Sequence, residues 1–261
     1  MFTTNPFVGL WALVPPTVMQ TYVVTMILLV IGGTLFDIAH KKSANYFFNN
    51  WRKVKKKGRR IDGGEMLSLA VQTVLTEVLA SAEFCNVRRR IAHLLTMYGF
   101  VTYVVTTTIM VFVYPTPADP TPGILPAMWW IGALMVCVGA SWFWFFIRVD
   151  VAAEGNSPFR VMRADLFILS LFATTTLGLI WACAQYSGNT TWSYVFLALY
   201  LIATTVLFGS IPWSKFSHMF YKPAAAFQKR IEQANGSRRD LPHPTDKPTT
   251  LGTAGRGAQH Y

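Results

Sequence analysis

Residues 17–39 read TVMQTYVVTMILLVIGGTLFDIA, an apolar run whose single charged residue, Asp37, lies close to its end. An α-helix needs about 20 mostly apolar residues to cross the hydrocarbon core of a bilayer, and this run is long enough. Four further runs of the same character follow, at about residues 91–114, 124–148, 166–186 and 192–211. The sequence therefore predicts an all-α, polytopic membrane protein with five transmembrane helices.

The composition supports this prediction and explains the charge of the chain. Hydrophobic residues make up 52% of the chain and charged residues 13%, about half the charged fraction of a typical soluble domain. The 23 Lys and Arg against 12 Asp and Glu give a net charge of +11. Such an excess is typical either of a protein that binds nucleic acid or of a membrane protein with basic loops on one side.

The positions of the basic residues decide between these two classes. Five spans create two sets of loops. The set with the N-terminus, residues 115–123 and residues 187–191 contains no Lys or Arg, and the other set holds all 23. The positive-inside rule places the basic set in the cytoplasm. We therefore expect an inner-membrane protein with its N-terminus outside and its C-terminus in the cytoplasm, and no nucleic acid as a partner.

The domain organisation expected from the sequence is simple. Residues 1–223 form a five-helix membrane domain, and residues 224–261 form a mostly disordered tail that begins with a short helix. Within the membrane domain, residues 40–90 contain a basic loop and a surface helix. The loop includes NNWRKVKKKGRR, residues 49–60. In residues 65–83 apolar side chains recur at helical spacing, which predicts an amphipathic helix that lies on the membrane surface or against a partner.

Two histidines are the best candidates for a cofactor site. The three cysteines share no spacing that would hold an iron–sulfur cluster or a zinc ion, so a redox centre would need other ligands. His93 begins the second span and His218 follows the fifth. These spans run in opposite directions, so both imidazoles come to the cytoplasmic boundary, where two helices of a bundle can hold a b-type haem. Arg90 and Lys215 would then pair with the haem propionates. Alternatively, both histidines are ordinary polar residues of the membrane interface.

Two motifs resemble a known family. RIAHLLTMYGF at residues 90–100 follows the Phe84–Cys85 pair, and SKFSHMFY occupies residues 214–221. Together they resemble the membrane cytochrome b subunits of the nitrate reductase gamma group, in the branch of quinone-interacting membrane-bound oxidoreductases and membrane heterodisulfide reductases. The resemblance covers about residues 66–223. It implies electron exchange between membrane quinone and a soluble cytoplasmic redox partner, with His93 and His218 as the axial ligands of haem b.

The chain departs from that family at two points. The family commonly carries a second haem nearer the outer face, but the corresponding positions here fall near Tyr103 and Tyr200, so we expect one haem. A fused cysteine-rich domain is also missing, so a separate flavin or iron–sulfur subunit would supply electrons. We expect it to dock on the basic loop 52–60 and the helix 65–83. In this domain content the chain resembles the proposed membrane anchor of dissimilatory adenylylsulfate reductase, an enzyme of sulfur metabolism.

The quinone site and the class of function leave alternatives. Asp37 and His40 are ionisable groups at the inner end of the first span, where they could serve quinone protonation. Asp165 is a third candidate, although it could simply pair with Arg163. The aromatic residues of the third span suit an interfacial belt better than a ligand pocket; they are Trp129, Trp130, Trp142, Phe143, Trp144, Phe145 and Phe146. A haem-free membrane anchor that tethers a cytoplasmic redox complex is the alternative function.

Overall fold

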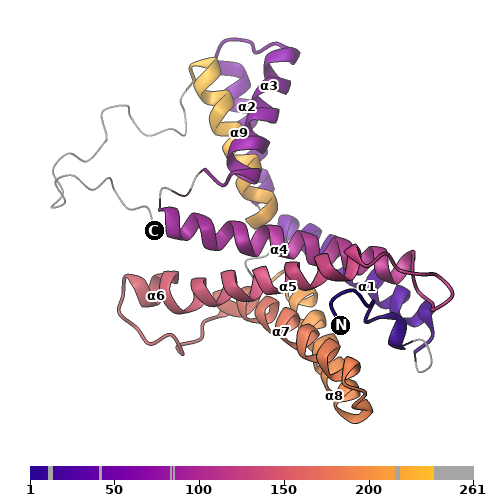
Figure 1. Ribbon diagram of the computed structural model, residues 1–261. Coiled ribbons are helices and arrows are strands. Elements are labelled where there is room, and N and C mark those ends of the chain that lie inside the picture. Colours follow the sequence, from indigo (N-terminus) through magenta and orange to yellow (C-terminus); the bar gives the residue numbers. More distant parts are fainter. Residues whose placement is uncertain (11–13, 41–42, 83, 85, 215–217, 238–261) are drawn as a thin grey trace. The chain divides into compact units, whose positions relative to one another are not determined.

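The computed structural model describes residues 1–10, 14–40, 43–82, 84, 86–214 and 218–237. Every regular element in these ranges is helical (Figure 1). Within them, five helices are long and apolar enough to cross a membrane, which confirms the predicted number of spans. They are α1 (Pro16–His40), α4 (Val87–Phe112), α5 (Ile124–Trp142) with its π-helical end η3 (Phe143–Ile147), α7 (Leu166–Tyr186) preceded by η4 (Arg163–Asp165), and α8 (Thr190–Gly209).

The chain divides into two compact units. The first consists of Met1–Leu35 and Ile91–Phe216, and the second of Phe36–Arg90 and Ser217–Tyr261. Besides the spans, the first unit contains the short helices η1 (Val8–Leu10) and α6 (Val149–Ala152). The second contains α2 (Ser43–Lys57), α3 (Gly63–Thr73), the π-helical turn η2 (Val74–Leu79) and α9 (His218–Asn235). The helix expected at the start of the tail is thus the C-terminal part of α9.

Helices α4 and α5 of the first unit come close together at glycine residues, which have no side chain to hold the two backbones apart. A Cβ atom on Gly132 of α5 would lie 2.9 Å from the carbonyl oxygen of Gly99 on α4, and a Cβ on Gly99 would lie 2.7 Å from the carbonyl oxygen of Gly132. Further along α5, a Cβ atom on Gly139 would lie 2.8 Å from the carbonyl oxygen of Ala92 on α4. Lipid tails provide no hydrophobic drive for helix association, so close backbone packing between small residues has to hold membrane helices together. Gly99, Gly132 and Gly139 make this contact between α4 and α5.

A core of aromatic rings fills one end of the first unit. Trp129 of α5 stacks on Tyr103 of α4, with ring centroids 5.0 Å apart, and Trp181 of α7 stacks on Tyr200 of α8 at 5.7 Å. Phe7 packs against both tryptophans. Trp129, Trp130 and Trp144 are buried, so the prediction of an interfacial belt is wrong for these three. Trp129 stacks on a ring of another helix, and an apolar run by itself cannot indicate which helices pack together.

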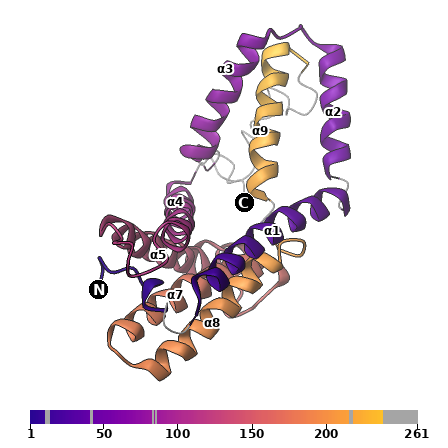
Figure 2. The same ribbon diagram turned by 90° about the vertical axis from the view of Figure 1, so that its right-hand side faces the viewer.

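The second unit is a layer of three helices. In Figure 2, α9 lies between α2 and α3, and α9 contacts both of them and η2. The Arg230 side chain of α9 donates a hydrogen bond to Glu77 (2.9 Å) and another to the Thr76 hydroxyl. On the other side, Asn235 Nδ2 donates to the carbonyl oxygen of Val54 on α2 (3.3 Å). These polar contacts join α9 to both of its neighbours.

The basic stretch at residues 52–60 is not a loop for most of its length, contrary to the prediction. It continues α2 as far as Lys57, because Lys and Arg are good helix formers and no Gly or Pro intervenes before Gly58. Val54 in this stretch is buried and lies inside the layer. Helix α2 ends at Lys57, and a Cβ atom on the next residue, Gly58, would lie 2.7 Å from the carbonyl oxygen of Asn235.

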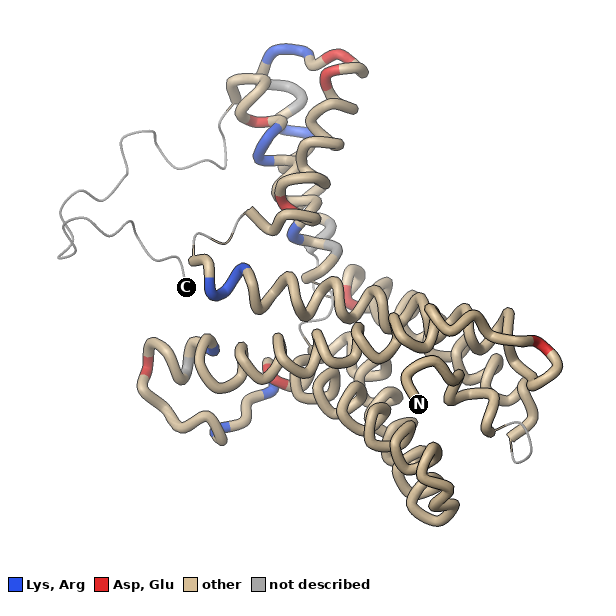
Figure 3. Tube along the Cα trace, viewed as in Figure 1, with Lys and Arg blue, Asp and Glu red and all other residues tan. Residues whose placement is uncertain are grey.

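Charged residues of the first unit are confined to the ends of its spans (Figure 3). Within residues 1–35 and 91–214, Asp119 lies in the loop after α4. All other charged side chains in these two ranges belong to residues 148–165. A charge within the hydrocarbon core is costly unless it is paired, so this distribution is the one that a membrane-spanning unit requires.

The glycine contact yields a stability prediction. We expect Gly132→Ala to lower the thermal unfolding midpoint in mild detergent, because the added methyl group forces the α4 and α5 backbones apart at a cost of about 1–3 kcal/mol. Gly32→Ala on α1 is the matched control: no atom lies within 4 Å of its Cβ position, so the higher helix propensity of Ala should leave stability unchanged or raise it. Equal midpoints for the two variants would contradict a close α4–α5 contact.

Candidate functional site

His93 lies on α4, in the first unit, next to the glycine contact. Its neighbour Ala92 is buried and faces Gly139 of α5, and the Thr96 hydroxyl donates to the Ala92 carbonyl oxygen (2.9 Å). The His93 side chain is half-buried. The close packing of this turn against α5 therefore fixes the direction in which the imidazole leaves the helix.

His218 is the first residue of α9, in the second unit, and its side chain is also half-buried. Because the two histidines belong to different units, their pairing on one iron stays a prediction. The donor chemistry fits the group that the resemblance implies, since neutral imidazole nitrogen is a common axial ligand of haem iron.

Of the two cations expected near the histidines, the structure describes Arg90 but not Lys215. Arg90 donates from Nε to the carbonyl oxygen of Ala80 (2.8 Å), just beyond the end of η2. This bond joins the first turn of α4 to the segment that follows η2. Lys215 lies outside the described residues. The propionate role assigned to both stays a prediction.

The proposed quinone residues Asp37 and His40 lie in different surroundings. Asp37 is almost fully buried, with 1% of its surface exposed, and it faces Tyr221 of α9. Burial raises the pKa of the Tyr221 hydroxyl, and the neighbouring Asp37 carboxylate raises it further, so the phenol keeps its proton. His40 is exposed and stacks on Phe36, with ring centroids 5.4 Å apart. The structure therefore puts Asp37 against a tyrosine that the sequence analysis did not single out.

Two tyrosines occupy the positions where the family commonly holds a second haem. The Tyr103 hydroxyl donates to the Tyr200 hydroxyl (3.1 Å), and both side chains are buried. A Cβ atom on Gly178 of α7 would lie 2.6 Å from the Tyr103 oxygen, so a third helix closes over the pair. With Trp129 and Trp181 stacked on the two phenols, this position does not fit a haem.

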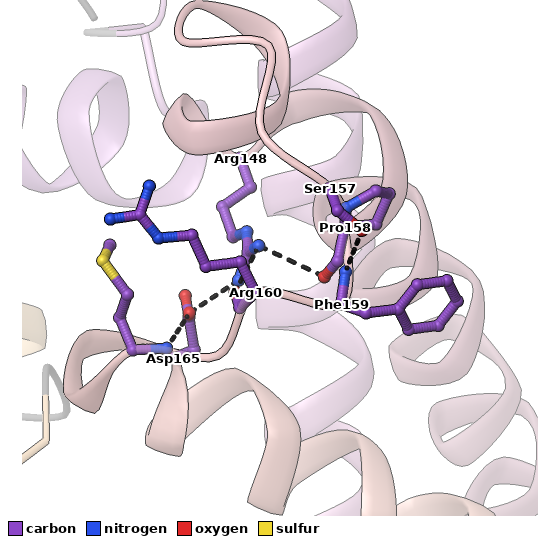
Figure 4. Close-up of polar contacts among 7 residues, drawn as sticks. Arg148, Ser157, Pro158, Phe159, Arg160 and Asp165 are labelled. Carbon is purple, nitrogen blue, oxygen red and sulfur yellow. Dashed lines mark hydrogen bonds and ion pairs between the residues drawn. The ribbon is translucent and has the colours of Figure 1, made fainter.

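A buried ion pair closes the connection between α5 and α7 (Figure 4). Arg148 Nη1 donates to Asp165 Oδ2 at 2.6 Å, and 4% and 5% of the two residues are exposed. The guanidinium also lies over the Trp144 ring, 4.0 Å from its centroid. Asp165 thus pairs with an arginine, as the alternative to a quinone role had it, but the partner is Arg148, and Arg163 is exposed. Sequence proximity favoured Arg163, whereas the π-helical end of α5 turns Arg148 toward the start of α7.

The second unit offers two surfaces that the sequence analysis assigned to a partner. Arg52 and Lys53 of α2 are exposed, beside an exposed Phe48. On α3 and η2, apolar side chains spaced by one and two helical turns are exposed, and we call them the apolar stripe: Leu67, Val71, Val74, Leu75 and Leu79.

The apolar stripe faces away from the layer, whose interior contains polar residues. Buried positions include Asn50, Gln228, Glu232 and Asn235 beside the apolar Val54 and Ile231. An amphipathic helix normally turns its apolar face inward, and here the larger apolar face of α3 and η2 is turned outward. A contiguous exposed apolar surface of this kind marks an interaction site.

Comparison with known proteins gives one distant relationship. No protein-family model matches the chain, and no solved structure matches it. The chain is similar to citrate utilization protein B of Escherichia coli, with 27% identity over 167 residues that cover 61% of this chain and 42% of that protein. The chain thus spans less than half the length of this relative. The resemblance to the nitrate reductase gamma group stays a prediction.

The buried ion pair yields a second prediction. We expect Arg148→Met to lower the free energy of unfolding by about 3–5 kcal/mol, because the Asp165 carboxylate is left buried without its cation. Adding Asp165→Asn should restore part of the loss, since the neutral amide removes the uncompensated charge. Arg163→Met, an exposed control, should change stability little. Thermal unfolding in detergent measures all four proteins, and an equal loss in the Arg163 variant would contradict the pairing.

Proposed function

We propose that this chain is a membrane haem b subunit that passes electrons between a soluble cytoplasmic oxidoreductase and the membrane quinone pool. The observation that carries the proposal is His93, a half-buried imidazole on a membrane span, at a turn held against α5. His93 and His218 would hold the haem iron, and the haem would supply one-electron chemistry when bound. The packed Tyr103–Tyr200 pair supports a single haem near the inner boundary.

The orientation belongs to the same proposal. The N-terminus lies outside, the C-terminus lies in the cytoplasm, and the membrane is the cell inner membrane. The distribution of Lys and Arg supports this orientation, because in the first unit the described basic residues all lie between Arg148 and Arg163, on one side of the spans. His93, near the start of α4, then lies near the cytoplasmic boundary, where a soluble partner can reach the site.

The second unit is the proposed docking element for that partner. The apolar stripe on α3 and η2 would be buried by the oxidoreductase, and the exposed cations Arg52 and Lys53 would steer an acidic surface toward it.

The quinone site is proposed at the inner end of α1. Reduction of a quinone takes up two protons, and a carboxyl group near the headgroup can relay them while a protonated phenol beside it donates a hydrogen bond to the quinone oxygen. The Asp37–Tyr221 contact supplies such a pair, and His40 lies less than one turn from Asp37 on the exposed side of the same helix.

Two identities are proposed for the soluble partner, and they differ in the substrate that it oxidises or reduces. The resemblance to the proposed membrane anchor of adenylylsulfate reductase favours that enzyme, and the name of the distant relative favours a pathway of citrate utilization. The alternative function, a haem-free anchor, is favoured by the outward-facing apolar stripe, which could tether a complex without any cofactor. Co-purification of a flavin or iron–sulfur enzyme without a haem chromophore would favour the anchor.

The haem prediction is tested by visible absorption. A dithionite-reduced minus oxidised spectrum of the purified protein should show the bands of a b-type haem, and His93→Ala or His218→Ala should abolish them. His243→Ala, in the polar tail, is the matched control and should keep the full signal. A wild-type protein that is folded but colourless after expression in haem-replete cells would contradict the proposal.

The docking prediction uses the apolar stripe. We expect Val71→Glu combined with Leu75→Glu to abolish co-purification of the soluble partner while the haem spectrum stays unchanged, because two carboxylates cannot be buried in an apolar interface without large cost. Gln233→Glu, an exposed position on α9, adds a carboxylate elsewhere on the same unit and should retain the partner. Retention of the partner by the double variant would contradict docking on the stripe.

A further inference from the structure

Three phenylalanines are exposed where the π-helical end of α5 meets its connection to α7. Phe146 and Phe159 are 72% and 78% exposed, and Phe145 between them is also exposed. The Phe145 ring lies 6.5 Å from Phe146 and 6.4 Å from Phe159, in edge-to-face arrangements. Phe145 and Phe146 lie on η3, the end of the third span, and Phe159 lies on the connection that follows. The exposed rings thus form one apolar cluster where the span ends, and such a cluster indicates a binding surface.

Local backbone chemistry forces Phe159 outward. Residues 157–160 read SPFR, and Arg160 N donates to the Ser157 carbonyl oxygen (3.1 Å), which closes a β-turn. Pro158 occupies the second position of the turn, where its fixed φ is favourable. Phe159 N donates to the Ser157 hydroxyl (3.3 Å). Phe159 is therefore at the apex of the turn, and its ring points away from the ion pair (Figure 4).

Arg148 holds this turn in place. Its Nη2 atom donates to the carbonyl oxygens of Pro158 (3.2 Å) and Arg160 (2.7 Å), the two residues on either side of Phe159. The other Nη atom is held by Asp165, so the buried guanidinium fixes the turn to the ends of two spans. The exposed ring is thus presented by a rigid support and does not fold back into the protein.

Two cations lie on the same connection as Phe159. Arg160 and Arg163 are both exposed, and the carboxylate of Asp165 is already engaged by Arg148 and by the backbone N–H of Met162. Among the side chains that the structure describes on this connection, Glu154 is an exposed acid, and it accepts a hydrogen bond from Asn156. In Figure 4 the Arg160 side chain and the Phe159 ring leave the turn in opposite directions, so the turn presents an apolar group on one side and a cation on the other.

We propose that this connection is a binding site for anionic phospholipid. The Phe145, Phe146 and Phe159 rings enter the boundary between headgroups and acyl chains, and Arg160 and Arg163 bind the headgroup phosphate. The occupant is lipid because the connection joins two membrane spans directly, so its ends lie at the membrane boundary whichever way the protein is oriented. Arginine pairs with phosphate oxygens through a planar fork of donors, and anionic lipids attract basic residues at this depth.

The position of the rings is tested by spin labelling in liposomes. In the full chain with Cys85, Cys137 and Cys183 replaced by Ser, a nitroxide at Phe159→Cys should be accessible to oxygen and protected from a water-soluble relaxation agent. A nitroxide at Glu154→Cys, the matched control on the same connection, should show the opposite. Equal exposure of both labels to the aqueous agent would overturn the proposal and would leave the rings as a surface for a soluble protein.

The headgroup preference is tested by binding of fluorescent phosphatidylglycerol in detergent, with phosphatidylcholine as the neutral comparison. Arg160→Gln combined with Arg163→Gln should weaken phosphatidylglycerol binding by on the order of tenfold, as expected for two surface arginines near anionic lipid. Arg52→Gln combined with Lys53→Gln removes the same charge from α2 and should have little effect. An equal loss in both double variants, or no preference over phosphatidylcholine in the wild type, would overturn the site.

Discussion

The contact between Gly99 of α4 and Gly132 of α5 is the constraint on which the first unit depends. A hydrogen atom in place of a side chain lets each backbone come within van der Waals distance of the other, and in a bilayer such packing replaces the hydrophobic effect that would join the helices in water. The contact sets the position of Tyr103 against Trp129. It also sets the position of Ala92 on α4 against Gly139, further along α5. The direction of His93 and the packing of the aromatic core both follow from it.

Three pairs of polar groups in the first unit join one helix to another. Tyr103 bonds to Tyr200, the Trp129 indole N–H donates to the Thr107 hydroxyl (3.0 Å), and Arg148 bonds to Asp165. In a medium of low dielectric constant an unpaired polar group is costly, so each pair makes one arrangement of its helices strongly preferred. The same requirement that makes polar residues rare in the spans gives the few that are present a large structural effect.

The second unit follows a different rule. Its layer of α2, α9 and α3 is joined by side chains such as Arg230 and Asn235, and its largest apolar surface faces outward. A soluble domain of this size would place that surface inside, because burial of apolar area is the main source of its stability. The second unit therefore leaves apolar side chains of α3 and η2 exposed, and this surface is the one assigned to a partner in the proposed function.

The length and periodicity of apolar runs were sufficient to predict the five spans, and the 65–83 pattern was sufficient to predict the helix that forms α3 and η2. Both depend only on local composition and on the need of a backbone in lipid to bond within its own segment. The sequence also indicated His93 and His218 as candidate ligands, because imidazoles near span ends are few. Tertiary packing decided the rest: Asp165 pairs with Arg148 and not with Arg163, Trp129 and Trp144 are core and not belt, and Tyr221 faces Asp37. These contacts join residues 12 or more positions apart, and which residues meet depends on how helices cross, a property that no single apolar run contains.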